Sequence, residues 1–109
     1  MSRTEAAEIL RIHISESDRH GGKPLYEAIV EHCRAAGIAG ATVLPGLEGF
    51  GEADEMHRGH VVHSDRPVVV IVVDRAENIG RLMLRVSEMM DTGVMARSAV
   101  EMVRVEKAG

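Results

Sequence analysis

The pattern of hydrophobic and polar positions changes period several times along the chain and predicts four strands and two helices in the order βαββαβ. Residues 67–73 (PVVVIVV) are the clearest strand because their apolar side chains continue through both parities. The two helical stretches instead repeat apolar residues every three or four positions. The predicted strands cover residues 8–15, 41–51, 67–73 and 94–105, and the predicted helices cover residues 24–36 and 74–90. Polar residues 1–7 predict a flexible N-terminal tail, which leaves residues 8–106 as a single domain.

This order is the ferredoxin-like split βαβ pattern, which predicts an α+β sandwich with a four-stranded antiparallel sheet and both helices on one face. The first and third strands should lie at the sheet centre, and Pro45 places the second strand at an edge. Two helices cover only one face of such a sheet, yet the third strand is apolar on both faces. We therefore expect the second face to be buried by self-association with closed symmetry.

The same topology places three polar connections at one end of the sheet, which we call the rim. The turn at residues 15–23, the long loop at residues 52–65 and the tight turn at residues 91–93 should all emerge there. Loops carried on a rigid sheet often hold binding groups, so the rim is where we expect the functional site.

The turn at residues 15–23 contains a candidate anion site formed by Gly21, Gly22 and Lys23. A chain that passes from a strand through a glycine turn into a helix starting at Pro24 leaves backbone N–H groups beside an ammonium. The positive end of the helix dipole favours an anion at the same place. The stretch lacks the spacing of a phosphate-binding P-loop. The alternative is that the glycines only shape the turn and that Lys23 is solvated.

Composition narrows the class of protein. The 109 residues are 45% hydrophobic and 28% charged, which is typical of one small globular domain. A net charge of −4, with no Trp, one Phe and one Tyr, argues against a nucleic-acid surface. The lone Cys33 lies on the apolar helix face and is expected to be a small buried hydrophobe. No stretch resembles a signal peptide or could span a bilayer, so we expect a cytoplasmic protein without membrane insertion.

Three motifs occur in a characteristic order: residues 16–30 (ESDRHGGKPLYEAIV), residues 37–43 (GIAGATV) and residues 46–51 (GLEGFG). Together they resemble the small bacterial and archaeal family of PII-like signalling proteins of unknown function, and the resemblance covers residues 9–105. That family is similar to the nitrogen-regulatory PII proteins and, more distantly, to the divalent-cation-tolerance proteins. Both of these groups are ferredoxin-like trimers.

The resemblance implies a homotrimer whose sheets face inward, with clefts for small ligands between subunits. It also implies that the loop at residues 52–65 reports the ligand state to a partner, such as a protein or a transporter. Gly49, Phe50 and Gly51 resemble the PII segment where the backbone approaches a bound nucleotide, and glycine leaves space there for a close ligand.

Near the carboxyl end, the paired arginines of PII proteins are reduced to Arg104 in this chain. The PII phosphate loop before the last strand has no counterpart, because Thr92-Gly93 leads directly into Val94. We therefore expect the turn at Gly21, Gly22 and Lys23 and the strand end at Gly49, Phe50 and Gly51 to come together, within or across subunits, as one anion site. Arg104 is the residue that the resemblance adds to this site.

Three histidines in the predicted loop suggest a second class of function. His57, His60 and His63 recur every three residues, and imidazoles are common ligands of Zn, Cu and Ni. The spacing matches no structural zinc pattern and supplies no thiolate, so a solvated loop is the alternative.

A third class, a small enzyme, rests on Glu16, Ser17, Asp18 and His20. No nucleophile elbow or triad motif surrounds them, and such clusters often cap turns. We therefore expect a non-enzymatic regulator that binds a small anionic metabolite at clefts between subunits. An adenine nucleotide is the ligand we favour. No cofactor is expected to be required. A protein that binds divalent metal through the loop histidines and a small enzyme are the two alternatives.

Overall fold

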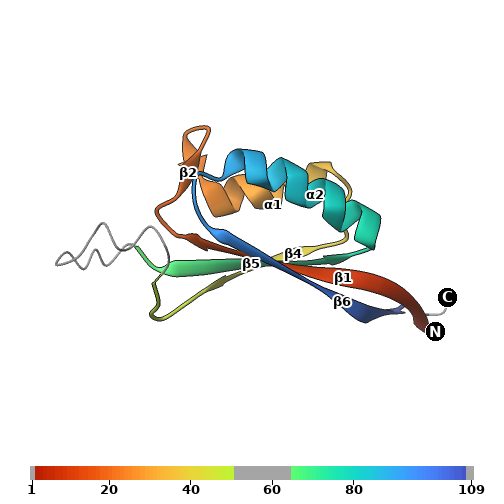
Figure 1. Cartoon of the computed structure of the whole chain (residues 1–109). Helices are drawn as coiled ribbons and strands as arrows, with labels where there is room; N and C mark the ends of the chain where they lie inside the picture. Colours follow the sequence, from red (N-terminus) through yellow and green to blue (C-terminus); the bar gives the residue numbers. More distant parts are fainter. Residues whose placement is uncertain (1, 51–64, 108–109) are drawn as a thin grey trace.

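The computed structural model describes residues 2–50 and 65–107, and these ranges form one four-stranded sheet, a short hairpin and two helices (Figure 1). The sheet strands and helices are β1 (Ser2–Ser15), α1 (Leu25–Ala35), β4 (Ala41–Pro45), β5 (Pro67–Asp74), α2 (Ala76–Met89) and β6 (Val94–Val105). The hairpin consists of β2 (Arg19–His20) and β3 (Lys23–Pro24). Neither helix in these ranges is long and apolar enough to cross a membrane.

The strand order of the sheet is β4-β5-β1-β6, and every neighbouring pair is antiparallel. Both helices pack on the same face (Figure 1). The predicted α+β ferredoxin-like architecture is confirmed, with β1 and β5 at the centre of the sheet and the strand ending at Pro45 at an edge.

The core lies between the helices and one face of the sheet. Residues at every second position of the two central strands are buried there and meet the apolar stripes of α1 and α2. Burying one such side chain contributes roughly 1.5–3 kcal/mol. The core cluster contains Leu10, Ile12, Ile14, Leu25, Ala28, Ile29, Cys33, Val68, Val70, Val72, Ile79, Leu82, Val86 and Met89. The expectation that Cys33 is a buried hydrophobe is confirmed.

The amino-terminal residues differ from the prediction, because β1 begins at Ser2 and not at residue 8. The prediction of a flexible tail is therefore wrong for residues 2–7, which pair with the last part of β6. Salt bridges from Arg3 to Glu106 and from Glu5 to Arg104 lie along this pairing. No helix covers the two strands here, and residues 2–5 of β1 are all polar, so the start of β1 shows no apolar alternation in the sequence (Figure 1).

The segment between β1 and α1 was predicted as a turn and is a small β-hairpin. His20 pairs with Lys23, so Gly21 and Gly22 form a two-residue loop. Their φ angles of 58° and 81° are positive at both central positions, as a type I′ turn requires. The helix then begins at Leu25, one residue after its predicted start at Pro24.

The second helix was predicted to begin at residue 74, and this is wrong because α2 begins at Ala76 and Arg75 occupies the N-cap position. Asp74 is instead the buried last residue of β5, and its carboxylate accepts three hydrogen bonds. The donors are Ala39 N–H (N···O 3.2 Å), Arg75 N–H (2.7 Å) and the Asn78 side-chain amide (2.9 Å). Burial by itself would raise the pKa of Asp74, but these hydrogen bonds and the charge of Arg104 lower it overall. The carboxylate thus ties the loop after α1 to the start of α2.

Candidate functional site

Gly21, Gly22 and Lys23 form the tip of the β2–β3 hairpin, on the helix side of the sheet (Figure 1). A Cβ placed on either glycine would meet no atom within 4 Å. Within one chain, the two glycines therefore serve the backbone shape of the turn and not a close approach to another element.

Lys23 is not simply solvated, because its Nζ donates to both carboxylate oxygens of Glu31 at 2.8 Å. The hydrogen bond and the negative charge of Glu31 raise the pKa of Lys23. At the start of the helix, Pro24 has no N–H and Leu25 N–H donates to the Asp18 carbonyl at 2.7 Å. An anion at the hairpin must therefore compete with Glu31 for the ammonium.

Residues 46–50 form a bend after β4, which we call the 46–50 bend. Gly46 N–H donates to the Pro67 carbonyl at 2.7 Å, which fixes the bend to the start of β5. A Cβ on Gly46 would lie 2.7 Å from Pro67 Cγ, and a Cβ on Gly49 would lie 3.2 Å from the same atom. Close packing on Pro67 thus explains both glycines without a ligand. Gly51 lies outside the described residues.

The bend holds apolar side chains in solvent. Phe50 is 90% exposed, and Leu47 is fully exposed. Phe50 is the one phenylalanine of the chain, so its large apolar surface is available to a ligand or another protein.

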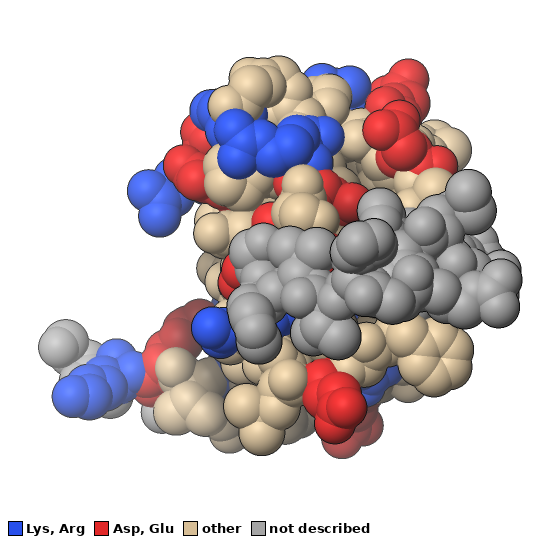
Figure 2. All heavy atoms as spheres, turned by 90° about the vertical axis from the view of Figure 1, so that its left-hand side faces the viewer, with Lys and Arg blue, Asp and Glu red and all other residues tan. Residues whose placement is uncertain are grey.

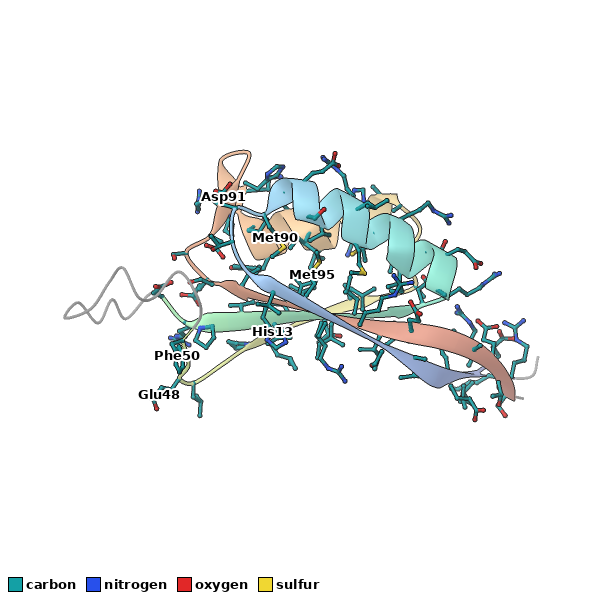
Figure 3. The ribbon with its side chains drawn as sticks, viewed as in Figure 1. His13, Glu48, Phe50, Met90, Asp91 and Met95 are labelled. Carbon is teal, nitrogen blue, oxygen red and sulfur yellow. The ribbon has the colours of Figure 1, made fainter. Side chains whose placement is uncertain are left out.

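The hairpin tip and Phe50 do not meet within one chain. The hairpin rises on the helix side, whereas Phe50 lies on the opposite side of the sheet, below the start of β5 (Figures 1 and 3). Arg104 lies near the end of β6, opposite Arg3 in the register, and its Nε contacts Glu5 Oε1 at 3.3 Å. This is the end of the sheet away from the rim. The three parts of the predicted site are therefore separate in the monomer.

The rim contains a hydroxyl and carboxylate cluster that the sequence did not reveal. The hydroxyls of Ser15 and Ser17 both donate to Asp65 Oδ1, and Ser15 N–H donates to Asp18 Oδ2 at 2.9 Å. These contacts join the end of β1 to the residues just before β5. Two of the residues considered for the enzyme hypothesis, Ser17 and Asp18, thus make hydrogen bonds that stabilise this end of the sheet.

The metal hypothesis rests on His57, His60 and His63, which lie outside the described residues. Within residues 2–50 and 65–107, no group of three or more His, Cys, Asp or Glu side chains is arranged to hold a metal ion.

The described surface seen from the rim end mixes basic and acidic side chains (Figure 2).

The sheet face away from the helices, which we call the open face, is mostly apolar. The registers align its side chains in rows across the four strands. One row contains Leu44, Val69, His13 and Val94, and the next contains Thr42, Ile71, Arg11 and Ala96. Leu44 is 48% exposed and Val94 is 52% exposed. The predicted two-sided character of the third strand thus leaves an apolar face that no helix or strand of the described residues covers.

Comparison with known proteins identifies relatives across most of the chain. A model of the DUF190 family, described as "Uncharacterized ACR, COG1993", matches residues 7–102. A UPF0166 protein of Aquifex aeolicus is 36% identical over 78 residues, which cover 70% of this chain and 74% of the relative. A UPF0166 protein of Methanocaldococcus jannaschii is 34% identical over 86 residues, which cover 75% of this chain and 77% of the relative.

Solved structures share the fold. The apo form of CPII from Thiomonas intermedia K12, a nitrogen regulatory PII-like protein, has a TM-score of 0.66 and 17% identity, covering 96% of this chain and all of that chain. CPII bound to ADP, AMP and bicarbonate has a TM-score of 0.66 and 16% identity, covering 92% and 98%. Identities this low establish the fold alone. As its motifs predicted, the chain has the PII-like ferredoxin fold and belongs to the DUF190 (UPF0166) family of uncharacterised proteins.

Proposed function

We propose that this protein is a non-enzymatic PII-like regulator that binds an adenine nucleotide at clefts between the subunits of a homotrimer. The observation that carries the proposal is Phe50, an aromatic ring that is 90% exposed at the end of the 46–50 bend, which a hydrogen bond to Pro67 fixes. A solvated ring of this kind offers a base a surface for stacking, which contributes about 1–3 kcal/mol per base in single-stranded nucleic-acid sites. The binding of ADP and AMP by CPII, a protein of the same fold, supports the choice of ligand.

The site takes its parts from two copies of the chain. Phe50 of one copy stacks on the adenine, and the Gly21-Gly22-Lys23 tip of the next copy faces the phosphates. Two copies are needed because the tip and Phe50 lie on opposite sides of the sheet within one chain (Figures 1 and 3). Lys23 then exchanges Glu31 for a phosphate group that carries more negative charge. Arg104 belongs to this site only where association brings it to the rim of another copy.

The readout follows from chain order. Gly51 and the loop at residues 52–65 directly follow Phe50, so a ligand that orders Phe50 also restrains the start of the loop. The loop then presents a ligand-dependent surface to a protein or transporter target in the cytoplasm. A ligand shifts this equilibrium only by its differential affinity for the two loop states, so binding should change the amide exchange of residues 52–65.

Calorimetric titration of the full chain with ADP and AMP, each with and without bicarbonate, tests the proposal. Lys23→Ala and Phe50→Ala should each weaken ADP binding, by about 10- to 100-fold, because each removes one contact of roughly 1–3 kcal/mol. Leu84→Ala is the matched control, since Leu84 is 73% exposed on α2 and lies outside the proposed site. A Zn²⁺ titration of the same protein tests the alternative based on His57, His60 and His63.

A mixing experiment tests whether the site is shared between copies. When the Lys23→Ala and Phe50→Ala chains are unfolded and refolded together, about a quarter of the interfaces should combine two intact halves and recover wild-type affinity. Each variant refolded alone should recover none. Equal ADP affinity of both variants and wild type would place the site elsewhere. Weakened variants that show no recovery on mixing would place it within one chain.

A further inference from the structure

Arg11 occupies an unusual position at the centre of the open face. It is half-buried on β1, beside Ile71 of β5 and Ala96 of β6 in the register. His13 lies on the same face two residues later (Figure 3). Among the described residues, neither side chain makes a hydrogen bond or an ion pair. Within residues 2–50 and 65–107, the guanidinium of Arg11 and the imidazole of His13 therefore lie among apolar strand neighbours without a charged partner.

Covering the open face would be costly unless Arg11 receives an anion. Apolar neighbours such as Val69, Ile71 and Val73 gain from leaving water, but a guanidinium buried with them needs a charged hydrogen-bond partner. The covering surface should accordingly combine an apolar side chain with a carboxylate. It should also be accessible on a protruding segment, because the open face of a twisted sheet is concave along one diagonal.

The 46–50 bend of the same chain has these properties. Leu47 is fully exposed, and the next residue, Glu48, is exposed and makes no ion pair with another described residue. Glu48 and His13 both lie on the side of the sheet away from the helices, whereas Asp91 lies on the helix side (Figure 3). Glu5, the other carboxylate on the open face, is already paired with Arg104. The bend is also preformed, since Pro67 fixes its backbone.

We propose that the 46–50 bend of one copy docks on the open face of a second copy, where Glu48 pairs with Arg11 and Leu47 packs on the apolar rows. The bend and its receptor surface are different parts of one chain, so the contact can repeat head-to-tail around a ring, as the proposed homotrimer requires. The inference rests on the assembly part of the proposed function and assigns the residues that make it. Phe50 is left to the nucleotide.

A charge swap tests the pair, with sedimentation velocity of the full chain over a range of concentrations as the measurement. Arg11→Glu and Glu48→Arg should each raise the dissociation constant of the oligomer at least about 30-fold, the loss typical of breaking a buried charge pair. The double variant should restore much of the association, because the charges again attract. Arg85→Glu and Glu88→Arg, which exchange an exposed pair at 3.6 Å on α2, are the matched controls and should change nothing.

The apolar contact of the proposed interface is tested by a second variant with a matched control. Leu47→Ser should weaken association, whereas Leu84→Ser, an equally drastic change at an exposed position on α2, should not. If Arg11→Glu fails to fold, Arg11→Gln replaces it. In Glu48→Arg, Arg11 and the new arginine repel each other across the interface. Adding Arg11→Gln to Glu48→Arg removes this repulsion and should partly restore association.

Single variants that associate like wild type, or a double variant no better than its parents, would overturn the pairing. A wild type that sediments as a monomer at micromolar concentration would overturn this interface and the proposed trimer together. ADP calorimetry on the same samples separates these results from the nucleotide proposal, because a monomer that still binds ADP leaves that part standing.

Discussion

Substitution of Asp74 by Asn tests how the buried carboxylate joins the two halves of the fold. Asp74 is 3% exposed and accepts hydrogen bonds from Ala39 N–H, Arg75 N–H and the Asn78 amide. An Asn side chain keeps one acceptor oxygen but turns an NH₂ group toward a donor, so at least one buried N–H loses its partner. A hydrogen bond to a charged group contributes about 1.5–3 kcal/mol to stability, so we expect Asp74→Asn to lower the free energy of unfolding by roughly 2–3 kcal/mol.

The loss should depend on pH. The folded-state pKa of Asp74 is lowered, so the wild-type carboxylate contributes its full stabilisation above the unfolded-state pKa of about 3.9. That contribution disappears as pH falls through the lower folded-state value. Asn does not titrate, so the gap between wild type and Asp74→Asn should be constant from pH 7 to about pH 5 and should narrow below about pH 4.

Urea unfolding at one fixed protein concentration, followed by circular dichroism at each pH, measures this gap. Asp91→Asn is the control, because Asp91 is exposed in the turn after α2, and its substitution should change the free energy of unfolding by at most about 0.5 kcal/mol. An Asp74→Asn variant as stable as this control at pH 7, or a gap that grows with acid, would refute the reasoning.

Two further predictions concern closely packed positions of the fold. Gly93→Ala should lower the free energy of unfolding by about 2–4 kcal/mol in the same assay, because φ is +136° and a Cβ would lie 2.9 Å from the His13 carbonyl oxygen. Gly22→Ala is the control, since φ is +81° but the space around it is open, and it should lower the free energy of unfolding by only about 1 kcal/mol. Cys33 should react with iodoacetamide at least about 100-fold more slowly in the native protein than in urea, because burial raises the pKa of its thiol and shields it; equal rates would contradict the buried position.

The sequence predicted those parts of the fold that depend on burial. Every second residue of β5 and the apolar stripes of the two helices face the core, so the apolar pattern identified these elements and their order predicted the sheet topology. The first half of β1 has no core to face, and backbone pairing with β6 holds polar side chains that resemble a tail. The β2–β3 hairpin was missed because its two strands contain two residues each, too few for any alternation.

The candidate site was less predictable because its residues contact partners that are not their neighbours in sequence. The sequence located Gly46 and Gly49 but could not show that Pro67, distant along the chain, is what excludes their side chains. It identified Lys23 as a cation and missed Glu31, two helical turns further on, as the group that holds it. Motif resemblance located the segments, and the sheet separated them onto opposite sides.

Binding and assembly are linked if the exposed groups of the single chain are satisfied by other copies. Phe50, Leu47 and the open face are apolar surfaces in water, and Arg11 lacks a counterion among the described residues. A nucleotide held between two copies binds only the assembled state, so it stabilises the assembly by about 2.7 kcal/mol per site at a hundred times its Kd. The linkage is reciprocal, and conditions that dissociate the oligomer must weaken nucleotide binding by the same factor. Nucleotide affinity should therefore fall on dilution below the oligomer dissociation constant, a dependence that a site within one chain would not produce.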